Sequence, residues 1–361
     1  MIASGGHKIV GDDCVSVLER LGDAAKKLAR KRILIAGASG FLPSYLADTI
    51  ACWNDHADPG SRARLVLLVR RPVGDRDRLA HLVGRSDTEF VVQDVVQDLS
   101  ARGRFDLIVH AASPASPRWY RKDPVGTIDA NSRGLRNLLE LAKHHEGASL
   151  LYFSSSEVYG TPEPQNVPTP ETYVGRTDPT DERACYVESK RLGETMCRAY
   201  FRQYGVAAKI ARPFHFFGPG LRMDDGRLIP ELLRCGLTEE PFELLSDGQA
   251  TRTYGYVAEA TIASLLILLS DMNGEVFNVG VDSPELSVLE VATLVAGMFG
   301  RTEPVRTNLG LPVADLRGAP SRACPDIAKL RKAFGYKPVI TLEKGLERTI
   351  EWFRCTLRET R

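Results

Sequence analysis

A strand that runs through a glycine-rich turn into a helix limits the folds open to this chain. Residues 32–36 (Arg-Ile-Leu-Ile-Ala) are apolar enough for a buried strand, residues 37–43 (Gly-Ala-Ser-Gly-Phe-Leu-Pro) follow directly, and a helical pattern continues to Ile50. In this context the glycines let the backbone approach a pyrophosphate, and the helix N-terminus supplies amide donors. The stretch predicts a dinucleotide site that includes Gly37, Ser39, Gly40, Phe41 and Leu42.

Further apolar segments of strand length follow, separated by helical patterns. They occupy residues 64–69, 90–95, 105–112, 150–153 and 206–212. Alternating strands and helices are typical of an α/β fold with a parallel sheet. We therefore expect a Rossmann-type, doubly wound parallel sheet.

The chain has 361 residues, more than one core comfortably fills. Residues 31–212 are predicted to form the dinucleotide-binding domain, and 213–361 a smaller C-terminal α/β substrate-binding lobe. The chain is expected to return to the main sheet around 254–280, through the stretches 251–257 and 276–280. Residues 1–30 are predicted to form an N-terminal helical extension of one or two short amphipathic helices.

Candidate cofactor contacts lie where the strands end, because ligands of an open parallel sheet bind beyond the carboxyl ends of its strands. We expect Asp94 to meet the adenine. Further predicted cofactor contacts at strand ends are Val95, Ala111, Ala112, Ser113 and Pro213.

The second strand ends in Val69-Arg70-Arg71 rather than in the acid that commonly holds the adenosine ribose. Arg70 could accept a 2′-phosphate, which would favour NADP. The alternative is that both arginines are surface residues and the ribose is held otherwise. NAD is the predicted cofactor, and NADP is not excluded.

A tyrosine and a lysine four residues apart, Tyr186 and Lys190, lie in a predicted helix and therefore share one face. A nearby positive charge favours the phenolate and lowers a phenol pKa from its reference value of about 10. Such pairs also occur by chance on solvated helices. Here the dinucleotide fold and a serine cluster at 154–156, which ends a core strand, favour a proton-transfer role.

With glycine turn, serine loop and Tyr–Lys helix in this order, the sequence resembles the extended short-chain dehydrogenase/reductases of the NAD-dependent epimerase/dehydratase family. The resemblance runs from about Lys31 to the C-terminus. Within the family the chain looks most like the UDP-glucuronate decarboxylases. This closer likeness rests on Ala-Ser-Pro-Ala-Ser-Pro at 112–117, Ser-Ser-Glu-Val-Tyr-Gly at 155–160, Arg-Ala-Cys-Tyr at 183–186, Asp-Gly-Arg at 225–227, Gln-Ala-Thr-Arg at 249–252 and Arg-Ala-Cys-Pro-Asp at 322–326.

The resemblance implies an enzyme that transiently oxidises a UDP-linked nucleotide sugar at C4 with bound NAD. Tyr186 would take the 4-hydroxyl proton, and Lys190 would lower the Tyr186 pKa and hold the nicotinamide ribose. Ser155 would hydrogen-bond the same sugar oxygen, with Ser156 beside it. The remaining implied roles are support of Lys190 by Asn131, a sugar contact for Glu157, and substrate contacts for Ser113, His215, Arg227, Arg252 and Arg322.

Four alternatives stay open. A 4-epimerase needs only the Tyr–Ser–Lys set, whereas a 4,6-dehydratase usually has Asp where this chain has Ser156. An NADP-dependent ketone reductase would use the two arginines of the second strand. A non-enzymatic NAD(P)-binding regulatory protein would have little use for the whole catalytic set. Pro43 and His215, the latter at a position commonly Asn, depart from the family pattern.

The formal net charge of +1 predicts no nucleic-acid partner, and we expect no membrane association and no metal site. Seven cysteines without a Cys-x-x-Cys pair favour a cytoplasmic location. The helices predicted at 131–144 and 186–204 resemble those of a four-helix dimer contact, which implies a homodimer.

Overall fold

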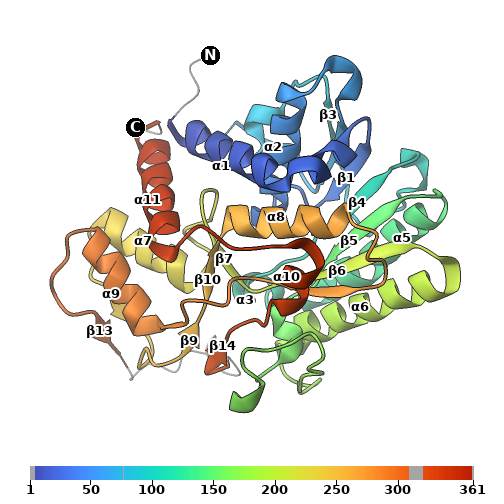
Figure 1. Cartoon of the computed structure of the whole chain (residues 1–361). Coiled ribbons are helices and arrows are strands. Elements are labelled where there is room, and N and C mark those ends of the chain that lie inside the picture. Colours follow the sequence, from blue (N-terminus) through green and yellow to red (C-terminus); the bar gives the residue numbers. More distant parts are fainter. Residues whose placement is uncertain (1–4, 76, 309–319, 360–361) are drawn as a thin grey trace.

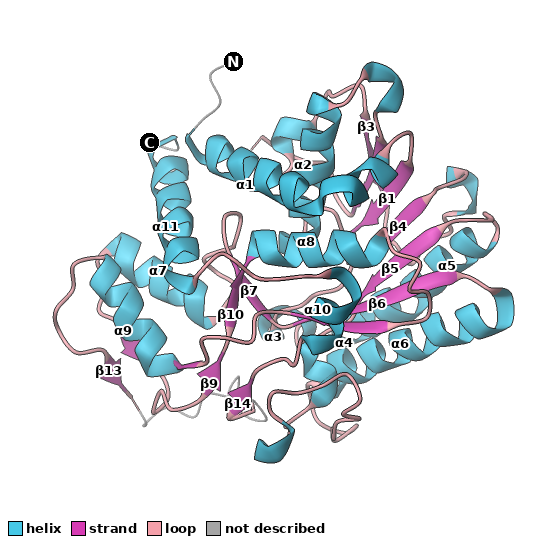
Figure 2. Ribbon diagram, in the orientation of Figure 1, coloured by secondary structure: helices cyan, strands magenta, loops and turns pink. Residues whose placement is uncertain are grey.

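The centre of the molecule is a seven-stranded sheet in which every pairing is parallel (Figures 1 and 2). This computed structural model describes residues 5–75, 77–308 and 320–359. The strand order is β11-β6-β5-β4-β1-β2-β3, so the order reverses between β1 and β4 and creates a crevice there. The predicted doubly wound, Rossmann-type sheet is confirmed. Its strands are β1 (Arg32–Ala36), β2 (Arg64–Val69), β3 (Thr88–Val92), β4 (Leu107–His110), β5 (Ser149–Phe153), β6 (Ala207–Pro213) and β11 (Val276–Val279).

Helices cover both faces of this sheet, which explains the nearly continuous apolar runs in its strands. Ile33 and Ile35 of β1 pack into one core, whereas Leu34 and Ala36 pack into the core on the opposite face. The first face carries α2 (Phe41–His56) and α8 (Val257–Leu268), and the second carries α5 (Leu135–Lys143) and α6 (Ala184–Tyr204).

The N-terminal extension is one long helix, α1 (Gly5–Leu21), followed by the 3-10 segment η1 (Gly22–Leu28). Helix α1 packs against α2, α8 and the C-terminal helix α11 (Leu342–Glu359), so both ends of the described chain meet on one side of the molecule (Figure 1). The extension is therefore part of the main packing unit.

The second lobe is built from short strands and helices. Its helices are α7 (Leu228–Thr238) and α9 (Val288–Met298), whereas α10 (Ala328–Phe334) packs against β11 of the main sheet. Its strands pair as β7 (His215–Phe217) with β10 (Tyr254–Tyr256), as β8 (Glu243–Leu244) with β13 (Arg306–Thr307), and as β12 (Leu286–Ser287) with β9 (Thr251–Arg252) and β14 (Arg322–Ala323).

The prediction that residues 251–257 rejoin the main sheet is wrong. Tyr254 pairs with His215 instead, because β7 leaves the end of β6 and offers its edge to β10. The chain returns to the sheet only after α8, when β11 pairs with β6, as expected for residues 276–280.

The remaining elements are short connections. The helix predicted from residue 131 begins earlier, as α4 (Pro124–Asp129), and passes through a π-helical turn, η5 (Ala130–Gly134), into α5. The others are α3 (Pro117–Tyr120), η2 (Pro59–Ser61), η3 (Ala80–Leu82), η4 (Ser100–Arg102), η6 (Ser156–Tyr159) and η7 (Pro164–Asn166).

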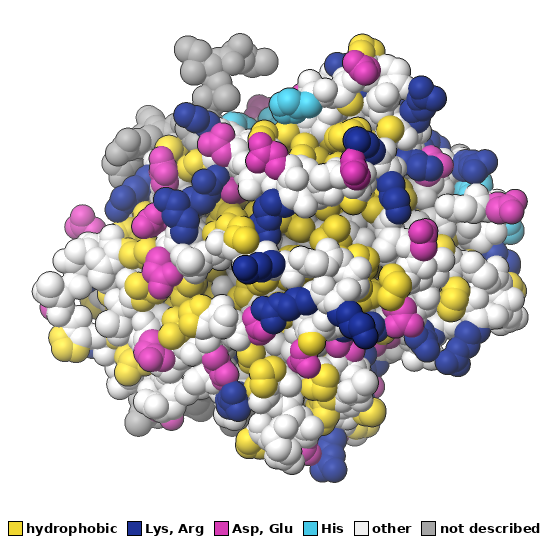
Figure 3. Space-filling view, in the orientation of Figure 1, with side chains coloured by type: hydrophobic (Ala, Val, Ile, Leu, Met, Phe, Trp, Pro, Cys, Tyr) yellow, Lys and Arg dark blue, Asp and Glu magenta, His cyan; other side chains and the backbone are white. Residues whose placement is uncertain are grey.

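Positive and negative side chains are interspersed on the face shown in Figure 3. Of the helices that the structure describes, none combines the length and the apolar character needed to cross a bilayer. In the same described residues, no group of three or more His, Cys, Asp or Glu is arranged to hold a metal ion.

Candidate active site

The glycine turn brings β1 close to the end of β4. Gly37 has φ +79°, and a Cβ built on it would lie 2.6 Å from the Ala112 Cα. A side chain at this position would therefore push the two strand ends apart. Phe41 and Leu42 are the first residues of α2, where backbone amides have no partner within the helix. The tight turn and these amides fit the pyrophosphate of NAD.

Tyr186 and Lys190 lie together in the first turns of α6, as predicted. The Lys190 Nζ lies 5.6 Å from the centroid of the Tyr186 ring and donates a 2.7 Å hydrogen bond to the Phe153 carbonyl at the end of β5. Both side chains are buried. Burial lowers the pKa of Lys190 to about 7, although the charge of Glu194 acts in the opposite direction. Lys190 therefore titrates near neutral pH.

The expected lowering of the Tyr186 pKa is not found in this structure. Burial raises the pKa of Tyr186 well above its ordinary value, and the charge of Glu157 raises it further. A hydrogen bond with Ser155 and the charge of Arg227 act in the other direction but do not outweigh burial. The helical spacing predicted the pair correctly, but it could not predict how completely the phenol would be desolvated.

The serine loop lies against this pair. The Ser155 Oγ accepts a 3.1 Å hydrogen bond from the Glu157 amide, and Ser156 begins η6. The Glu157 carboxylate forms a 2.9 Å ion pair with Arg183, the residue before α6. Glu157 is thus held beside the catalytic helix.

Asn131 lies in the π-helical turn and fixes α6 from the side. Its Nδ2 donates a 2.9 Å hydrogen bond to the Ser189 Oγ, directly before Lys190. Within the described residues the buried Asn131 Oδ1 has no hydrogen-bond partner. The amide thus supports the Lys190 turn and keeps a free acceptor in the site.

A cleft of about 290 Å³ separates the serine loop from the second lobe. Ala184 and Val187 of α6 line it on the Tyr186 side. Five predicted catalytic or substrate residues are among its walls, namely Ser156, Glu157, His215, Arg252 and Arg322. The structure therefore joins residues of the serine loop with residues that lie up to 166 positions further along the chain, at Arg322, in one cleft.

The basic residues of the cleft differ in their partners. Arg322 holds Glu285 through hydrogen bonds of 2.8 and 2.7 Å. The Arg252 guanidinium binds backbone carbonyls instead, those of Thr251 at 2.7 Å, Ser321 at 3.2 Å and Pro320. Burial, followed by the charges of Arg252 and Arg227, lowers the pKa of His215 to about 3, so this ring is neutral.

Two predicted substrate residues do not line the cleft. Arg227 forms an ion pair with Asp225, although its charge acts on both Tyr186 and His215. Ser113 follows β4 on the cofactor side, next to Ala111 and Ala112.

The other predicted cofactor contacts lie along the carboxyl edge of the sheet. Val95 is buried against Gly134, and Asp94 accepts a 3.0 Å hydrogen bond from the Val96 amide. Arg70 is exposed at the end of β2, and Pro213 ends β6. Their contacts with a cofactor remain predictions.

Residues 33–280 match the sequence profile of the NAD dependent epimerase/dehydratase family. The chain belongs to this family. The predicted family and its NAD cofactor are thereby confirmed.

Relatives within the family include nucleotide-sugar decarboxylases. UDP-glucuronic acid decarboxylase 1 of Xenopus tropicalis is 36% identical over 328 residues, which cover 91% of this chain and 73% of the relative. UDP-glucuronic acid decarboxylase 5 of Arabidopsis thaliana is 32% identical over 326 residues, 90% of each chain.

Solved structures share the fold. The dTDP-glucose 4,6-dehydratase of Streptomyces venezuelae, solved with NAD, has a TM-score of 0.76 and 25% identity and covers 90% of this chain and 97% of its own. The UDP-glucuronic acid 4-epimerase of Bacillus cereus, solved with UDP-glucuronic acid and NAD, has a TM-score of 0.73 and 24% identity and covers 90% of this chain and 99% of its own.

Two residues of the site were not predicted from the sequence of this family member. The Tyr120 ring stacks on Tyr186, with centroids 5.0 Å apart and planes at 11°. His110, at the end of β4, accepts from the Ala112 amide at 3.3 Å and donates to the Ala130 carbonyl at 3.0 Å. Burial and the charge of Lys190 lower the pKa of His110 to about 3, which keeps it neutral. No local pattern distinguishes either residue from an ordinary core aromatic.

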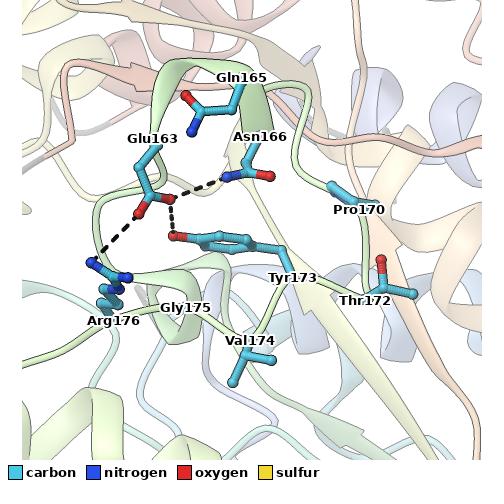
Figure 4. Close-up of a pocket in the computed structure, with 9 residues that line it drawn as sticks. All are labelled: Glu163, Gln165, Asn166, Pro170, Thr172, Tyr173, Val174, Gly175 and Arg176. Atoms are coloured by element: carbon cyan, nitrogen blue, oxygen red, sulfur yellow. Dashed lines mark hydrogen bonds and ion pairs between the residues drawn. The ribbon is translucent and has the colours of Figure 1, made fainter.

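A second, larger hollow of about 470 Å³ lies in the loop between η6 and α6 (Figure 4). Its polar groups bind one another: Glu163 accepts from the Tyr173 hydroxyl at 2.7 Å and from Asn166 at 3.1 Å, and it lies 3.8 Å from Arg176. None of the predicted site residues lines this hollow. The smaller cleft is therefore the candidate active site of this epimerase/dehydratase family member.

Proposed function

We propose that this family member is a nucleotide-sugar decarboxylase that converts UDP-glucuronate to UDP-xylose through transient oxidation at C4. The observation that carries the proposal is the cleft, which is lined by Ala184 and Val187 of α6 on one side and by His215, Arg252 and Arg322 of the second lobe on another. Tyr186 lies in the same turn of α6 but is not itself among the lining residues. A diphosphate-linked uronic acid brings negative charge to the guanidinium groups of Arg252 and Arg322, whereas the neutral His215 ring can only form hydrogen bonds with it. The relatives named UDP-glucuronic acid decarboxylase support the choice of substrate.

The proposed chemistry needs a base, a hydrogen-bond donor and a hydride acceptor at the sugar C4. NAD, held by the glycine turn and the residues at the strand ends, supplies reversible hydride transfer. Tyr186 takes the 4-hydroxyl proton as the hydride leaves C4, for which it must be a phenolate. The protonated form of Lys190 and the hydrogen bond with Ser155 favour that phenolate, against the effect of burial.

The resulting 4-keto group makes the C6 carboxylate a β-keto acid. The C5–C6 bond then breaks, carbon dioxide leaves, and the electron pair enters an enolate whose oxygen Tyr186 and Ser155 stabilise by hydrogen bonds. Protonation at C5 and return of the hydride to C4 complete the reaction. Glu157 lies at the sugar ring and is oriented by Arg183.

Ser156 favours decarboxylation over 4,6-dehydration. Dehydration requires proton donation to a leaving hydroxyl, for which a serine hydroxyl is a poor acid. A carboxylic acid at this position would have favoured the dehydratase.

A 4-epimerase is the second candidate. Tyr186, Ser155 and Lys190 are sufficient for oxidation and reduction at C4, and the Bacillus cereus 4-epimerase shares the fold. His215, where the family pattern commonly has Asn, is the residue at which sugar selection would change.

The deciding experiment incubates the purified protein with UDP-glucuronate and NAD and analyses the product by mass spectrometry and NMR. A UDP-pentose with release of carbon dioxide supports the decarboxylase. Unchanged mass with inverted C4 assigns the 4-epimerase instead. Steady consumption of added NADPH would indicate a ketone reductase, and turnover unaltered by Tyr186→Phe would contradict the whole mechanism.

The homodimer is also a proposal. Val125 and Ile128 of α4 are 68% and 41% exposed, and Leu192 of α6, a helix that packs against α4, is 46% exposed, so a second copy would cover these apolar side chains. Helices α5 and α6 of two copies would form the contact. Light scattering of wild type and Leu192→Glu tests this: a dimer that the substitution dissociates is expected, and a monomeric wild type contradicts it.

We propose a cytoplasmic location because of the free cysteine thiols. All seven cysteines of the chain are free. Reduced thiols are typical of a reducing compartment. Fractionation of the source cells would test this location.

A further inference from the structure

Arg78 connects the glycine turn to the second lobe. It lies in the loop that follows β2, and its Nη1 donates a 2.8 Å hydrogen bond to the Ser39 carbonyl in the turn between β1 and α2. Its Nε donates to the Gly220 carbonyl, in the loop that leads from β7 to α7. Gly220 has φ +82°, and a Cβ there would lie 3.4 Å from the Arg78 side chain. One guanidinium thus spans the two sides of the cofactor groove.

The charge of Arg78 is not matched by an adjacent carboxylate. Two nearby arginines each form an ion pair with a carboxylate: Arg71 pairs with Asp77 at 2.6 Å, and Arg222 pairs with Asp224 at 2.8 Å. Among the described residues, no carboxylate oxygen lies within ion-pair distance of Arg78, whose hydrogen bonds go to carbonyls.

The surroundings of Arg78 favour an anion. Burial, followed by the charge of Arg222, lowers the pKa of Arg78 to about 10, and the more distant carboxylates of Asp225 and Asp224 act in the opposite direction without outweighing burial. A bound anion would relieve both effects. An arginine is suited to this because its planar fork can bind phosphate oxygens through two hydrogen bonds.

The position of Arg78 indicates which anion. Ser39 directly precedes Gly40 and the first amides of α2, where the pyrophosphate of a dinucleotide binds in this type of fold. The second strand, which leads into the Arg78 loop, ends beside the adenosine ribose. We propose that Arg78 binds the pyrophosphate of NAD and holds the second-lobe loop over it, which retains the cofactor between hydride removal and return.

The test measures cofactor binding without any sugar, so that its outcome is independent of the proposed decarboxylation. Arg78→Ala is compared with Arg71→Ala, a neighbour in the same loop whose charge Asp77 already matches. Calorimetry gives the affinities for NAD, ADP and UDP, ligand-observed NMR gives that for adenosine, and chromatography gives the NAD content of the purified protein.

We expect Arg78→Ala to weaken NAD and ADP binding about 10- to 100-fold, the range for a lost charged hydrogen bond, and to lower the NAD content. Adenosine affinity should stay within about twofold, because adenosine has no phosphate. Arg71→Ala should leave all these values within about twofold.

Three results would overturn the proposal. The first is an unchanged NAD affinity in Arg78→Ala. The second is an equal loss of affinity for NAD and for adenosine, which would mean that Arg78 only orders the loop. The third is a weakened UDP affinity with an unchanged NAD affinity, which would assign Arg78 to the substrate site. If Arg78→Ala does not fold, Arg78→Lys replaces it. Several-fold weaker NAD binding by Arg78→Lys, with unchanged adenosine affinity, then supports binding of the pyrophosphate by the planar Arg78 guanidinium. A wild-type NAD affinity refutes it.

Discussion

Two buried polar clusters of this protein differ in whether side chains of the protein itself partner their central ionisable group. In the first, the carboxylate of Asp13 from α1 accepts hydrogen bonds from the hydroxyls of Tyr256 at 2.6 Å and Tyr45 at 3.1 Å, and it lies 2.8 Å from Arg348. In the second, around Tyr186, Lys190 donates to a backbone carbonyl and the Asn131 Oδ1 has no partner within the described residues.

The difference separates a structural cluster from the proposed catalytic one. Asp13 joins α1, α2, β10 and α11, and side chains of the protein itself occupy its carboxylate. The Tyr186 cluster leaves donors and acceptors for molecules from outside. Both clusters contain strongly shifted pKa values, about 6 for Asp13 and about 7 for Lys190, so a perturbed pKa alone does not mark a catalytic site.

The sharpest test of the comparison is Tyr186→Phe. Loss of the base should reduce kcat for the sugar substrate roughly 1,000-fold, within the range for general acid–base groups, while the free energy of unfolding changes by less than about 1 kcal/mol. Steady-state kinetics and urea unfolding measure the two effects. Tyr200→Phe, which removes a hydroxyl at the outer end of the same helix, is the control. Activity near wild type in Tyr186→Phe would end the catalytic assignment.

Asp13→Ala should produce the opposite result. It leaves Arg348 and two tyrosine hydroxyls without their partner, which should cost about 2–4 kcal/mol of unfolding free energy. The kcat of the folded protein should stay within about twofold of wild type, since Asp13 is outside the cleft. Urea unfolding and kinetics provide the measurements, with the exposed Asp12→Ala as control. A large loss of kcat without loss of stability would remove the distinction between the clusters.

Asn131→Ala should give an intermediate effect. Loss of its hydrogen bond to Ser189 lets the Lys190 turn shift, and a misplaced catalytic group should lower kcat by roughly 10- to 100-fold. Asn166→Ala, at the second hollow, is the matched control because it also loses a side-chain hydrogen bond (Figure 4). Equal kcat values for the two variants would show that Asn131 has no positioning role.

The smallest expected effect is the pH dependence of stability at Asp13. Burial raises its pKa from 3.8 to about 6, so the folded protein binds this proton more tightly than the unfolded chain does. The stabilisation of the folded protein by protonation of Asp13 is therefore present at low pH and is lost as the pH rises through 6. From pH 7 to pH 5, wild type should gain about 1 kcal/mol relative to Asp13→Asn. Urea unfolding of both proteins at the two pH values checks this, and a relative loss would reverse the assigned direction.

Local patterns along the chain determined most of the fold and the chemistry of the site. Apolar runs predicted the strands of the main sheet, because strands covered on both faces carry apolar residues throughout. The glycine turn and the spacing of Tyr186 and Lys190 also follow from local geometry, since turn and helix conformations depend on near neighbours. These features predicted a dinucleotide fold with a phenol–lysine pair, and the resemblance to a family supplied the substrate class.

Only the tertiary structure decided which distant residues meet and how far they are desolvated. It assigned residues 251–256 to small sheets of the second lobe, stacked Tyr120 on Tyr186, and placed Arg78 across the glycine turn. It also raised the Tyr186 pKa that the helical spacing alone predicts to be lowered. Burial and charge depend on neighbours far away in the chain, as the hydrogen bond between Asp13 and Tyr256, 243 positions apart, illustrates, and no local pattern contains that information.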